Sequence, residues 1–346
     1  MHKGKVEPQF RFELVQNGIK IGEAYPLNKP TLRCNADAEV KISLSGNFVL
    51  DIPTPNWLKT NIRPYLIRGD DEERLGEYII TQADYASDKN GLISWELKGM
   101  DFGQIPKRVK TEERVVFKAG EKYTDIVQSI LLSLGIQNIL TVTSDAVLAN
   151  DRADWEIGTS YLKIINELLE EINYQSVWFD MQGNARISPM TNPKNSAVQH
   201  EYLQGELSEV KKQADVSSDI FKAYNVFVAM VSSPEYDEPL VAIAENNEPT
   251  SKISTVNIGR IQAPIKKLDD ISSLDELQKY VDNLLFQSMR SMESVSFRTS
   301  LNVHQVRDLI AIDHPICNGI YQEVEWKMTL SHDGEMTHTA EKVVFE

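Results

Sequence analysis

The 346-residue sequence has little of what marks secreted or membrane proteins. Its only two cysteines, Cys34 and Cys317, fit a reducing compartment better than an oxidising one. One disulfide between them is the alternative interpretation. No run of about 18 apolar residues occurs, so we expect no insertion into a membrane. Residues 1–8 lack the apolar core of a signal peptide, so we expect no secretion by that route.

Positive charge is also scarce. The sequence has 36 Lys and Arg residues against 51 Asp and Glu residues, which gives a net charge of −15. A protein that grips nucleic acid needs a basic face to displace counterions, so we expect no specific nucleic-acid binding. The charge favours solubility, and it also suits a surface that DNA passes without sticking.

Motifs of catalysis are missing as well. No His-Glu-x-x-His, Cys-x-x-Cys pair or Gly-x-Ser-x-Gly pattern occurs, and no phosphate-binding glycine loop is present. The acidic runs at 70–73, 170–171 and 269–270 join sequence neighbours, whereas a glycosidase needs carboxylates facing across a cleft. We interpret them as solvated charges. We therefore predict no enzyme activity, no cofactor, and no catalytic, cofactor-binding or metal-binding residues.

Histidine is a common metal ligand, so each histidine is a candidate for a metal site. The sequence has six of them: His2, His200, His304, His314, His332 and His338. His332 and His338 flank a predicted turn, and a metal site there would need further ligands that the sequence does not offer. We expect a structural or solvent-exposed role for both.

The first hundred residues show the pattern of short β-strands. Phe10, Phe12 and Leu14 alternate with polar residues, and Asn17-Gly18 suits a type I′ turn into the next strand. Further strands are expected near residues 40–44, 65–68, 76–83 and 92–99, with the proline-rich residues 52–56 as a connection. Short strands with regular turn signals predict a small antiparallel β-barrel over residues 1–105.

The middle of the chain changes to a helical period. Apolar residues between 124 and 134 fall on one helical face, with Gly135 at the position of a C-cap. A second helix is expected over about 159–171, followed by a hairpin at Gln182-Gly183-Asn184. These elements predict a separate α/β domain over residues 106–204.

The last third returns to β. It is expected to form a second barrel over residues 205–346 with a helical insertion at about 272–293, where Ser273 and Glu276 have capping-box spacing. Residues 232–270 contain four prolines and predict a long excursion or edge hairpin. The expected fold class is α+β, mainly β, with two small antiparallel barrel-like domains that flank or enclose an α/β domain.

Two hairpins far apart in the sequence share a layout. Gly76 and Gly319 each open a strand with a tyrosine two residues later, and Gly91 and Gly334 follow at equal spacing in the next turn. Chance likeness between two hairpins is the alternative to an internal duplication. Three copies of a chain with two similar barrels present six near-equivalent barrels, so a threefold object can dock on a sixfold one.

Three groups of residues, in order along the chain, carry a family resemblance. They are residues 75–81 with 95–101, residues 116–126 with 155–159 and 177–184, and residues 308–310 with 319–321 and 331–334. Each group alone is degenerate, whereas their order and spacing together are moderately specific. Together they resemble the tail-hub proteins of phages and phage-tail-like bacteriocins, which include the late-control-protein family. The likeness covers most of the chain from about residue 60.

The resemblance implies a structural baseplate hub without enzyme activity. It implies a homotrimer whose barrels form a pseudo-sixfold ring, linking the sixfold tail tube protein to the threefold spike or tip protein of a contractile tail or tail-like bacteriocin. It also implies contacts with other baseplate proteins, assembly in the bacterial cytoplasm, and residence in the virion or tail-like particle. If three copies surround a DNA channel, an acidic or neutral lumen is expected.

Two other functions stay open from the sequence. Residues 118–135 loosely resemble LysM-like modules that bind cell-wall sugars, although an ordinary βα element that packs on its own sheet is the simpler interpretation. The first alternative is therefore a cell-wall-binding or hydrolytic tail-tip protein built around residues 106–204. The second is a distal-tail or receptor-binding subunit of a flexible-tailed phage, which uses similar β-rich building blocks.

Overall fold

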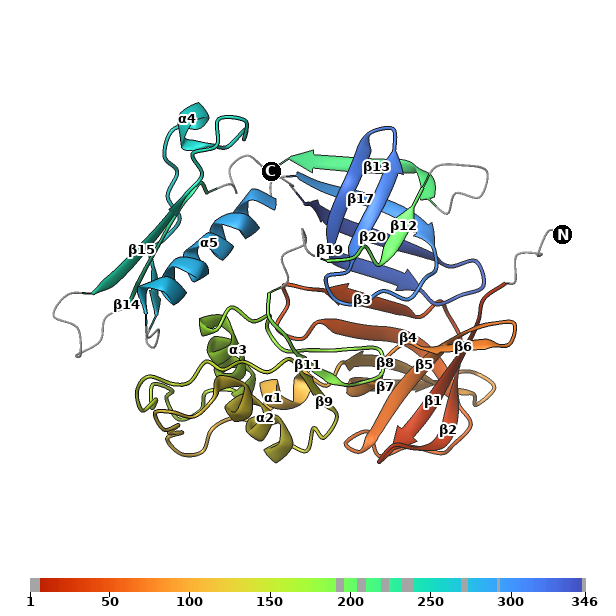
Figure 1. Ribbon diagram of the computed structural model, residues 1–346. Coiled ribbons are helices and arrows are strands. Elements are labelled where there is room, and N and C mark those ends of the chain that lie inside the picture. The colour runs from red at the N-terminus through yellow and green to blue at the C-terminus, as the bar shows by residue number, and fades with distance from the viewer. Residues whose placement is uncertain are drawn as a thin grey trace.

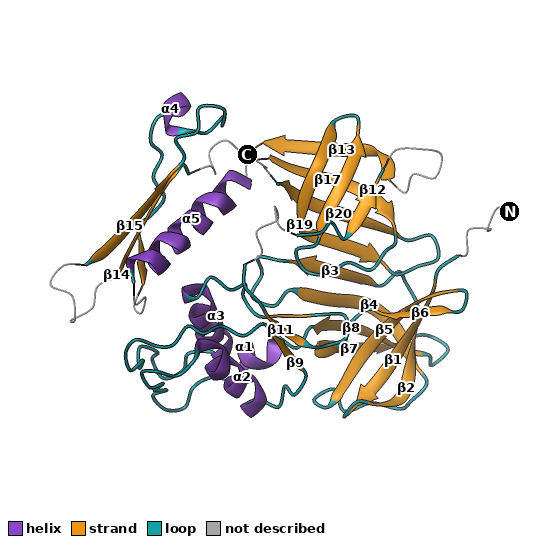
Figure 2. Ribbon diagram, viewed as in Figure 1, coloured by secondary structure: helices purple, strands orange, loops and turns teal. Residues whose placement is uncertain are grey.

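The computed structural model describes residues 7–190, 196–203, 210–218, 224–231, 239–268, 273–290 and 293–343. Strands dominate, and the predicted α+β, mainly β class is confirmed (Figure 1). The helices gather on one side of the molecule, and the two large groups of strands lie one above the other on the opposite side (Figure 2). The predicted domain limit at 105 falls inside the first short helix, and the limit at 204 lies outside the described residues.

Residues 7–103 form the N-terminal β domain. Its strands are β1 (Gln9–Gln16), β2 (Ile19–Pro26), β3 (Thr31–Asn35), β4 (Ile42–Leu50), β5 (Thr60–Arg68), β6 (Asp71–Arg74), β7 (Tyr78–Ser87) and β8 (Ile93–Met100). Hydrogen bonds close six of them into a ring in the order β1–β2–β4–β8–β7–β5–β1. Asn17 and Gly18 both have positive φ, as the predicted type I′ turn requires. Phe12, Phe48 and Leu66 belong to the buried core.

Residues 104–190 follow as an α/β unit. Its elements are α1 (Gln104–Arg108), α2 (Tyr123–Ser133), β9 (Ile139–Thr141), α3 (Tyr161–Glu171), β10 (Trp178–Phe179) and β11 (Ala185–Ile187). The apolar face of α2, including Ile126 and Ile130, shares one core with Ile165 and Leu168 of α3. Ser160 caps α3 by accepting the Lys163 N–H. The helical face within residues 118–135 is therefore used inside its own unit, as in an ordinary βα element.

The C-terminal β domain contains residues 196–203, 210–218 and 293–343. Its strands are β12 (His200–Tyr202), β13 (Val210–Ser218), β17 (Glu293–Ser300), β18 (Leu309–His314), β19 (Cys317–Thr329) and β20 (Glu335–Lys342). They pair in the order β13–β17–β20–β19–β18–β12, and only the β12–β18 pair is parallel among them. No pairing joins β12 to β13 within the described part of the chain, so this set is not closed into a ring.

A small module, residues 224–290, lies between β13 and β17 in the sequence and off to one side of both β domains (Figure 1). It contains β14 (Val226–Val231), β15 (Leu240–Glu245), α4 (Thr255–Ile258), β16 (Lys266–Leu268) and α5 (Leu274–Arg290). One face of α5 packs on the three-stranded sheet. Ser273 Oγ accepts the Glu276 N–H at 3.2 Å, as the predicted capping box requires of the serine. The predicted insertion at 272–293 corresponds to α5; residues 232–238, 269–272 and 291–292 of the predicted excursion and insertion lie outside the described residues.

The two hairpins that share a sequence layout also share strand pairing. Gly76 and Gly319 both have positive φ, at 102° and 130°, just before β7 and within β19. In each hairpin the pairing register shifts three residues after the tyrosine, at Thr81 in β7 and at Val324 in β19. The likeness ends at the turn, because Gly91 has positive φ and Gly334 does not.

Candidate functional site

The two β domains join along a single pair of strands, β3 and β19, which we call the within-chain joint. These strands pair antiparallel, from Thr31 opposite Thr329 to Asn35 opposite Glu325. The side chains at its centre are at most 1% exposed: Leu32, Cys34, Trp326 and Met328. The joint makes one continuous sheet of strands from both domains.

Charged side chains surround the within-chain joint. Arg33 pairs with Glu325 across it at 2.6 Å, and Lys29 pairs with Asp333. The hydrogen bond from Lys29 lowers the pKa of Asp333 to about 2. Ion pairs that stand partly in water contribute about 0–1 kcal/mol each, so the apolar side chains hold the joint together.

Beside the joint, the C-terminal β domain buries a cluster of three ionisable side chains from the loop before β18 and from β19 and β20. His304, Glu323 and His338 are each at most 1% exposed. Glu323 lies between the two imidazoles: its Oε2 is 2.7 Å from His304 Nδ1, and its Oε1 is 2.5 Å from His338 Nδ1. His304 Nε2 is 2.7 Å from the hydroxyl of Tyr202, and the His200 ring stacks on the His304 ring at 3.7 Å.

The hydrogen bonds determine how many protons His304, Glu323 and His338 hold together. Thr299 donates its single hydroxyl hydrogen to the Ser300 carbonyl oxygen at 2.8 Å, so Thr299 Oγ1 can only accept from His338 Nε2 at 2.7 Å. One further proton then lies between His338 Nδ1 and Glu323 Oε1. Because burial lowers the pKa of His304, we assign it as a neutral imidazole that donates from Nδ1 to Glu323 and accepts at Nε2 from Tyr202. The three side chains thus carry no net charge.

Burial favours this uncharged state. It raises the pKa of Glu323 to about 7 and lowers the pKa of His304 to about 3, because either charge would lose its hydration. Burial lowers the pKa of His338 as well. The donor atoms of His304, Glu323 and His338 lie within 4.8 Å of one another, which is close enough for a metal ion. The two ring nitrogens of His304 and the two of His338 each already have a hydrogen-bond partner. The arrangement is therefore complete as a hydrogen-bonded network.

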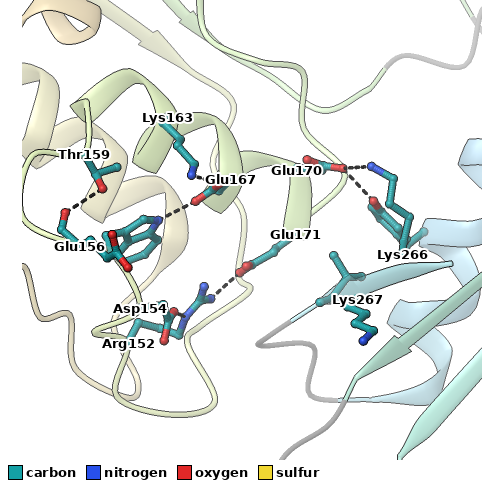
Figure 3. Close-up of a pocket in the computed structure, with 13 residues that line it drawn as sticks. Arg152, Asp154, Glu156, Thr159, Lys163, Glu167, Glu170, Glu171, Lys266 and Lys267 are labelled. Atoms are coloured by element: carbon teal, nitrogen blue, oxygen red, sulfur yellow. Dashed lines mark hydrogen bonds and ion pairs between the residues drawn. The ribbon is translucent and has the colours of Figure 1, made fainter. Parts of the chain in front are cut away.

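A cleft of about 570 Å³ lies where the α/β unit meets the small module (Figure 3). Its walls are mostly charged, and the charges bind one another: Arg152 pairs with Glu171 at 2.7 Å, and Lys266 with Glu170 at 3.5 Å. Tyr280 of α5 also donates to Glu170, at 2.7 Å. Since Lys266 and Tyr280 belong to the module and Glu170 to α3, these contacts attach the module to the α/β unit.

Several sequence expectations can be placed on the structure. His332 is exposed at the turn, with 74% of its side chain in solvent, whereas His338 is buried in the network. The solvated interpretation holds for Asp71, Glu72 and Glu73, and it is wrong for Glu171, which is buried beside Arg152. Residues 269–270 lie outside the described residues. Cys34 and Cys317 are both buried and free, so the disulfide alternative is not formed.

Sequence reasoning missed the histidine–glutamate network entirely. Its members come from the loop before β18 and from β19 and β20, with support from β12 and β17. No spacing in the sequence links them. The one available signal was strand alternation, which places Glu323 on the same face as Tyr321, two residues before it, and a buried carboxylate needs partners.

The fold is similar to that of solved phage tail proteins. No family model and no curated protein matches the sequence, so the likeness comes from solved structures. The tail protein from Neisseria meningitidis MC58 matches with a TM-score of 0.70 and 10% identity, over 96% of this chain and 97% of that chain. The 43 kDa tail protein of prophage MuSo2 from Shewanella oneidensis matches with a TM-score of 0.67 and 12% identity, over 96% and 98%.

A secretion-system protein shares the fold as well. The E. coli c3393 protein, a component of the type VI secretion system described as similar to the T4 tail proteins gp27 and gp5, matches with a TM-score of 0.57 and 9% identity, over 96% of this chain and 77% of that chain. The resemblance to phage tail and baseplate proteins is therefore confirmed at the level of fold. Among the described residues, no helix is long and apolar enough to cross a membrane.

Proposed function

We propose that this chain is a structural hub subunit of a phage tail or tail-like particle, with no enzyme activity. Three copies would form a homotrimer that links a sixfold tail tube to a threefold spike or tip. The observation that carries the proposal is the within-chain joint, which sets two β domains with matching hairpins side by side in one continuous sheet. Three such chains supply six similar docking units to the tube while keeping threefold symmetry for the spike.

The fold comparisons support the same role, since the matched solved structures are tail and secretion-system proteins. The proposed neighbours are the tail tube protein, the spike or tip protein and other baseplate proteins. Cytoplasmic assembly followed by residence in the particle belongs to the same proposal. The net charge of −15 is compatible with an acidic or neutral lumen that does not hold DNA.

The experiment that tests the hub function is a mass measurement by light scattering behind a sizing column. The chain is measured alone and with a candidate spike protein. A mass near three times 39.3 kDa, in either sample, supports the hub. A chain that stays monomeric with the spike protein present, and that sediments with purified peptidoglycan, would instead indicate the cell-wall-binding alternative.

A further inference from the structure

Among the strands that have an unpaired edge within the described residues, two are considered as a pair, one from each β domain. The first is β7: β8 pairs along one edge, while β5 pairs with the other edge only at Tyr78 and Ile79. Residues 82–87 of β7 therefore have one free edge. The second is β13, which pairs with β17 alone, so residues 215–218 also have one free edge. The two free edges belong to different β domains.

The free part of β7 corresponds to the part of β19 that forms the within-chain joint. In both strands, the tyrosine pairs with an earlier strand of its own domain: Tyr78 with Ile62 of β5, and Tyr321 with Ile310 of β18. Both strands then shift register three residues later. Beyond the shift, β19 pairs with β3 from Glu325 onward, whereas β7 has no partner on that edge.

The strand β13 corresponds in the same way to β3. In each domain, the residue just before the register shift begins a row of residues that are paired directly from one strand to the next. The row in the N-terminal β domain runs Ile80, Gly99, Leu44 and Leu32. The row in the C-terminal β domain runs Glu323, Ala340, Val295 and Val216. Val216 of β13 thus occupies the place that Leu32 has on β3.

Exposure agrees with this correspondence. At the within-chain joint, Leu32 lies directly opposite Met328, and both side chains are 0% exposed. Their counterparts are Val216 on β13 and Tyr85 on β7, since Tyr85 follows Tyr78 at the distance at which Met328 follows Tyr321. Val216 is 41% exposed and Tyr85 is 70% exposed. The apolar positions that the within-chain joint buries thus have counterparts, Val216 and Tyr85, that a single chain leaves exposed.

We propose that β13 of one copy pairs antiparallel with residues 82–87 of β7 of the next copy, in the register of the within-chain joint. This between-copy joint places Val216 opposite Tyr85, Ser217 opposite Asp84 and Ser218 opposite Ala83. The partner is a second copy of this chain, because each copy carries both matching edges: β13 as the counterpart of β3, and residues 82–87 of β7 as the counterpart of the paired part of β19. The proposal rests on the proposed trimer and adds its interface.

The between-copy joint has a definite symmetry. Because β7 and β13 lie in different domains, each copy uses one edge toward one neighbour and the other edge toward the second neighbour. Such a heterologous contact closes into a ring or extends as a filament. In the trimer, three between-copy joints alternate with three within-chain joints, and no strand edge of this kind stays open. Closing these edges also removes a site at which unpaired strands aggregate.

Paired cysteines test the register directly. Residues directly opposite in an antiparallel pair have Cα atoms about 4.5–5.5 Å apart, which suits a disulfide. Two in-register double variants are made, Tyr85→Cys with Val216→Cys and Asp84→Cys with Ser217→Cys, because neighbouring pairs alternate between the two spacings. Tyr85→Cys with Ser217→Cys is the control, since it is one residue out of register and its side chains point to opposite faces. The native thiols Cys34 and Cys317, which are present in every variant, are buried in the structure.

Each sample is weighed by light scattering, oxidised with copper phenanthroline and run on a non-reducing gel. At least one in-register double variant is expected to give covalent dimers and trimers, and the control only monomers. An equimolar mixture of the single variants Tyr85→Cys and Val216→Cys is expected to stop at dimers.

The possible failures are distinct. A mass of three subunits without cross-links in either in-register variant would overturn the between-copy joint and leave the trimer standing. Monomers at every concentration, without cross-links, would overturn both proposals. A covalent ladder beyond three chains would show an open filament and overturn closure of the ring.

Discussion

Replacing Glu323 by glutamine removes a buried carboxyl group and keeps its shape. The amide can accept from His304 Nδ1 through its oxygen and donate to His338 Nδ1 through its nitrogen, so the hydrogen bonds at 2.7 Å and 2.5 Å have replacements. The substitution therefore removes one proton-binding group without opening a cavity. We expect it to change how stability depends on pH more than stability at any single pH.

The direction follows from the raised pKa. Burial raises the pKa of Glu323 from 4.5 to about 7, so the folded chain binds this proton more tightly than the unfolded chain. The stabilising contribution is fully present below pH 4.5 and is lost as the pH rises through 7. The difference of about 2.5 between the two pKa values, at about 1.4 kcal/mol per unit, amounts to about 3.5 kcal/mol. The wild type should lose about this much stability relative to Glu323→Gln between pH 4.5 and 8.

The histidines act in the opposite direction in both proteins. Burial lowers the pKa values of His304 and His338, so their contribution is present above pH 6.5 and is lost as the pH falls. His200 and Asp308, hydrogen-bonded to each other at 3.0 Å, are the neighbouring ionisable groups and are also unchanged. Because Glu323 raises the pKa of His338, the difference between the two proteins reports the carboxyl group together with its effect on His338.

Urea unfolding measured at half-unit steps from pH 4.5 to 8 provides the assay, with midpoints compared at equal slope. Glu325→Gln is the matched control: it makes the same chemical change on the same strand, but its side chain is 33% exposed. Stability curves of wild type and Glu323→Gln that run parallel across this range would refute the proton count for the network.

Two further substitutions test the packing. Met328→Ala should destabilise the chain by about 2–5 kcal/mol, because it empties a fully buried position in the within-chain joint, whereas Met190→Ala at a 38% exposed position should cost far less in the same urea titration. Arg152→Met leaves the buried Glu171 without its cation and should lower the free energy of unfolding by roughly 3–5 kcal/mol, while Lys163→Met, at a 61% exposed position of the same cleft, should change it by under about 1 kcal/mol; equal effects would contradict the burial argument.

Local elements of this fold were predictable, because their signals lie within a few residues. Asn17-Gly18 predicted the turn between β1 and β2, and the apolar period over residues 159–171 predicted α3. The cap at Ser273 predicted the start of α5. The turn, the helix and the cap each depend on a local backbone preference or on a repeating apolar face. None of these signals requires knowledge of distant contacts.

The candidate site was not predictable in this way. The within-chain joint pairs β3, near the start of the chain, with β19, near its end, and strand alternation alone does not choose a partner. The histidine–glutamate network likewise depends on the order in which β17, β20 and β19 pair. The hairpin likeness noted in the sequence was the useful signal, because it identified β7 and β19 as counterparts before their neighbours were known.

The composition of the two joints agrees with their different tasks. The within-chain joint buries Trp326, Met328 and Leu32, and its strands belong to one chain, so they meet at high effective concentration as soon as the chain folds. The proposed between-copy joint must stay in water until a second copy arrives. Around Tyr85 and Val216 its strands carry small or polar residues, namely Ala83, Asp84, Ser217 and Ser218. A joint as apolar as the within-chain joint would expose an aggregation-prone strand edge on every free subunit. The small and polar side chains reduce this aggregation and keep the backbone hydrogen-bonding groups available for assembly.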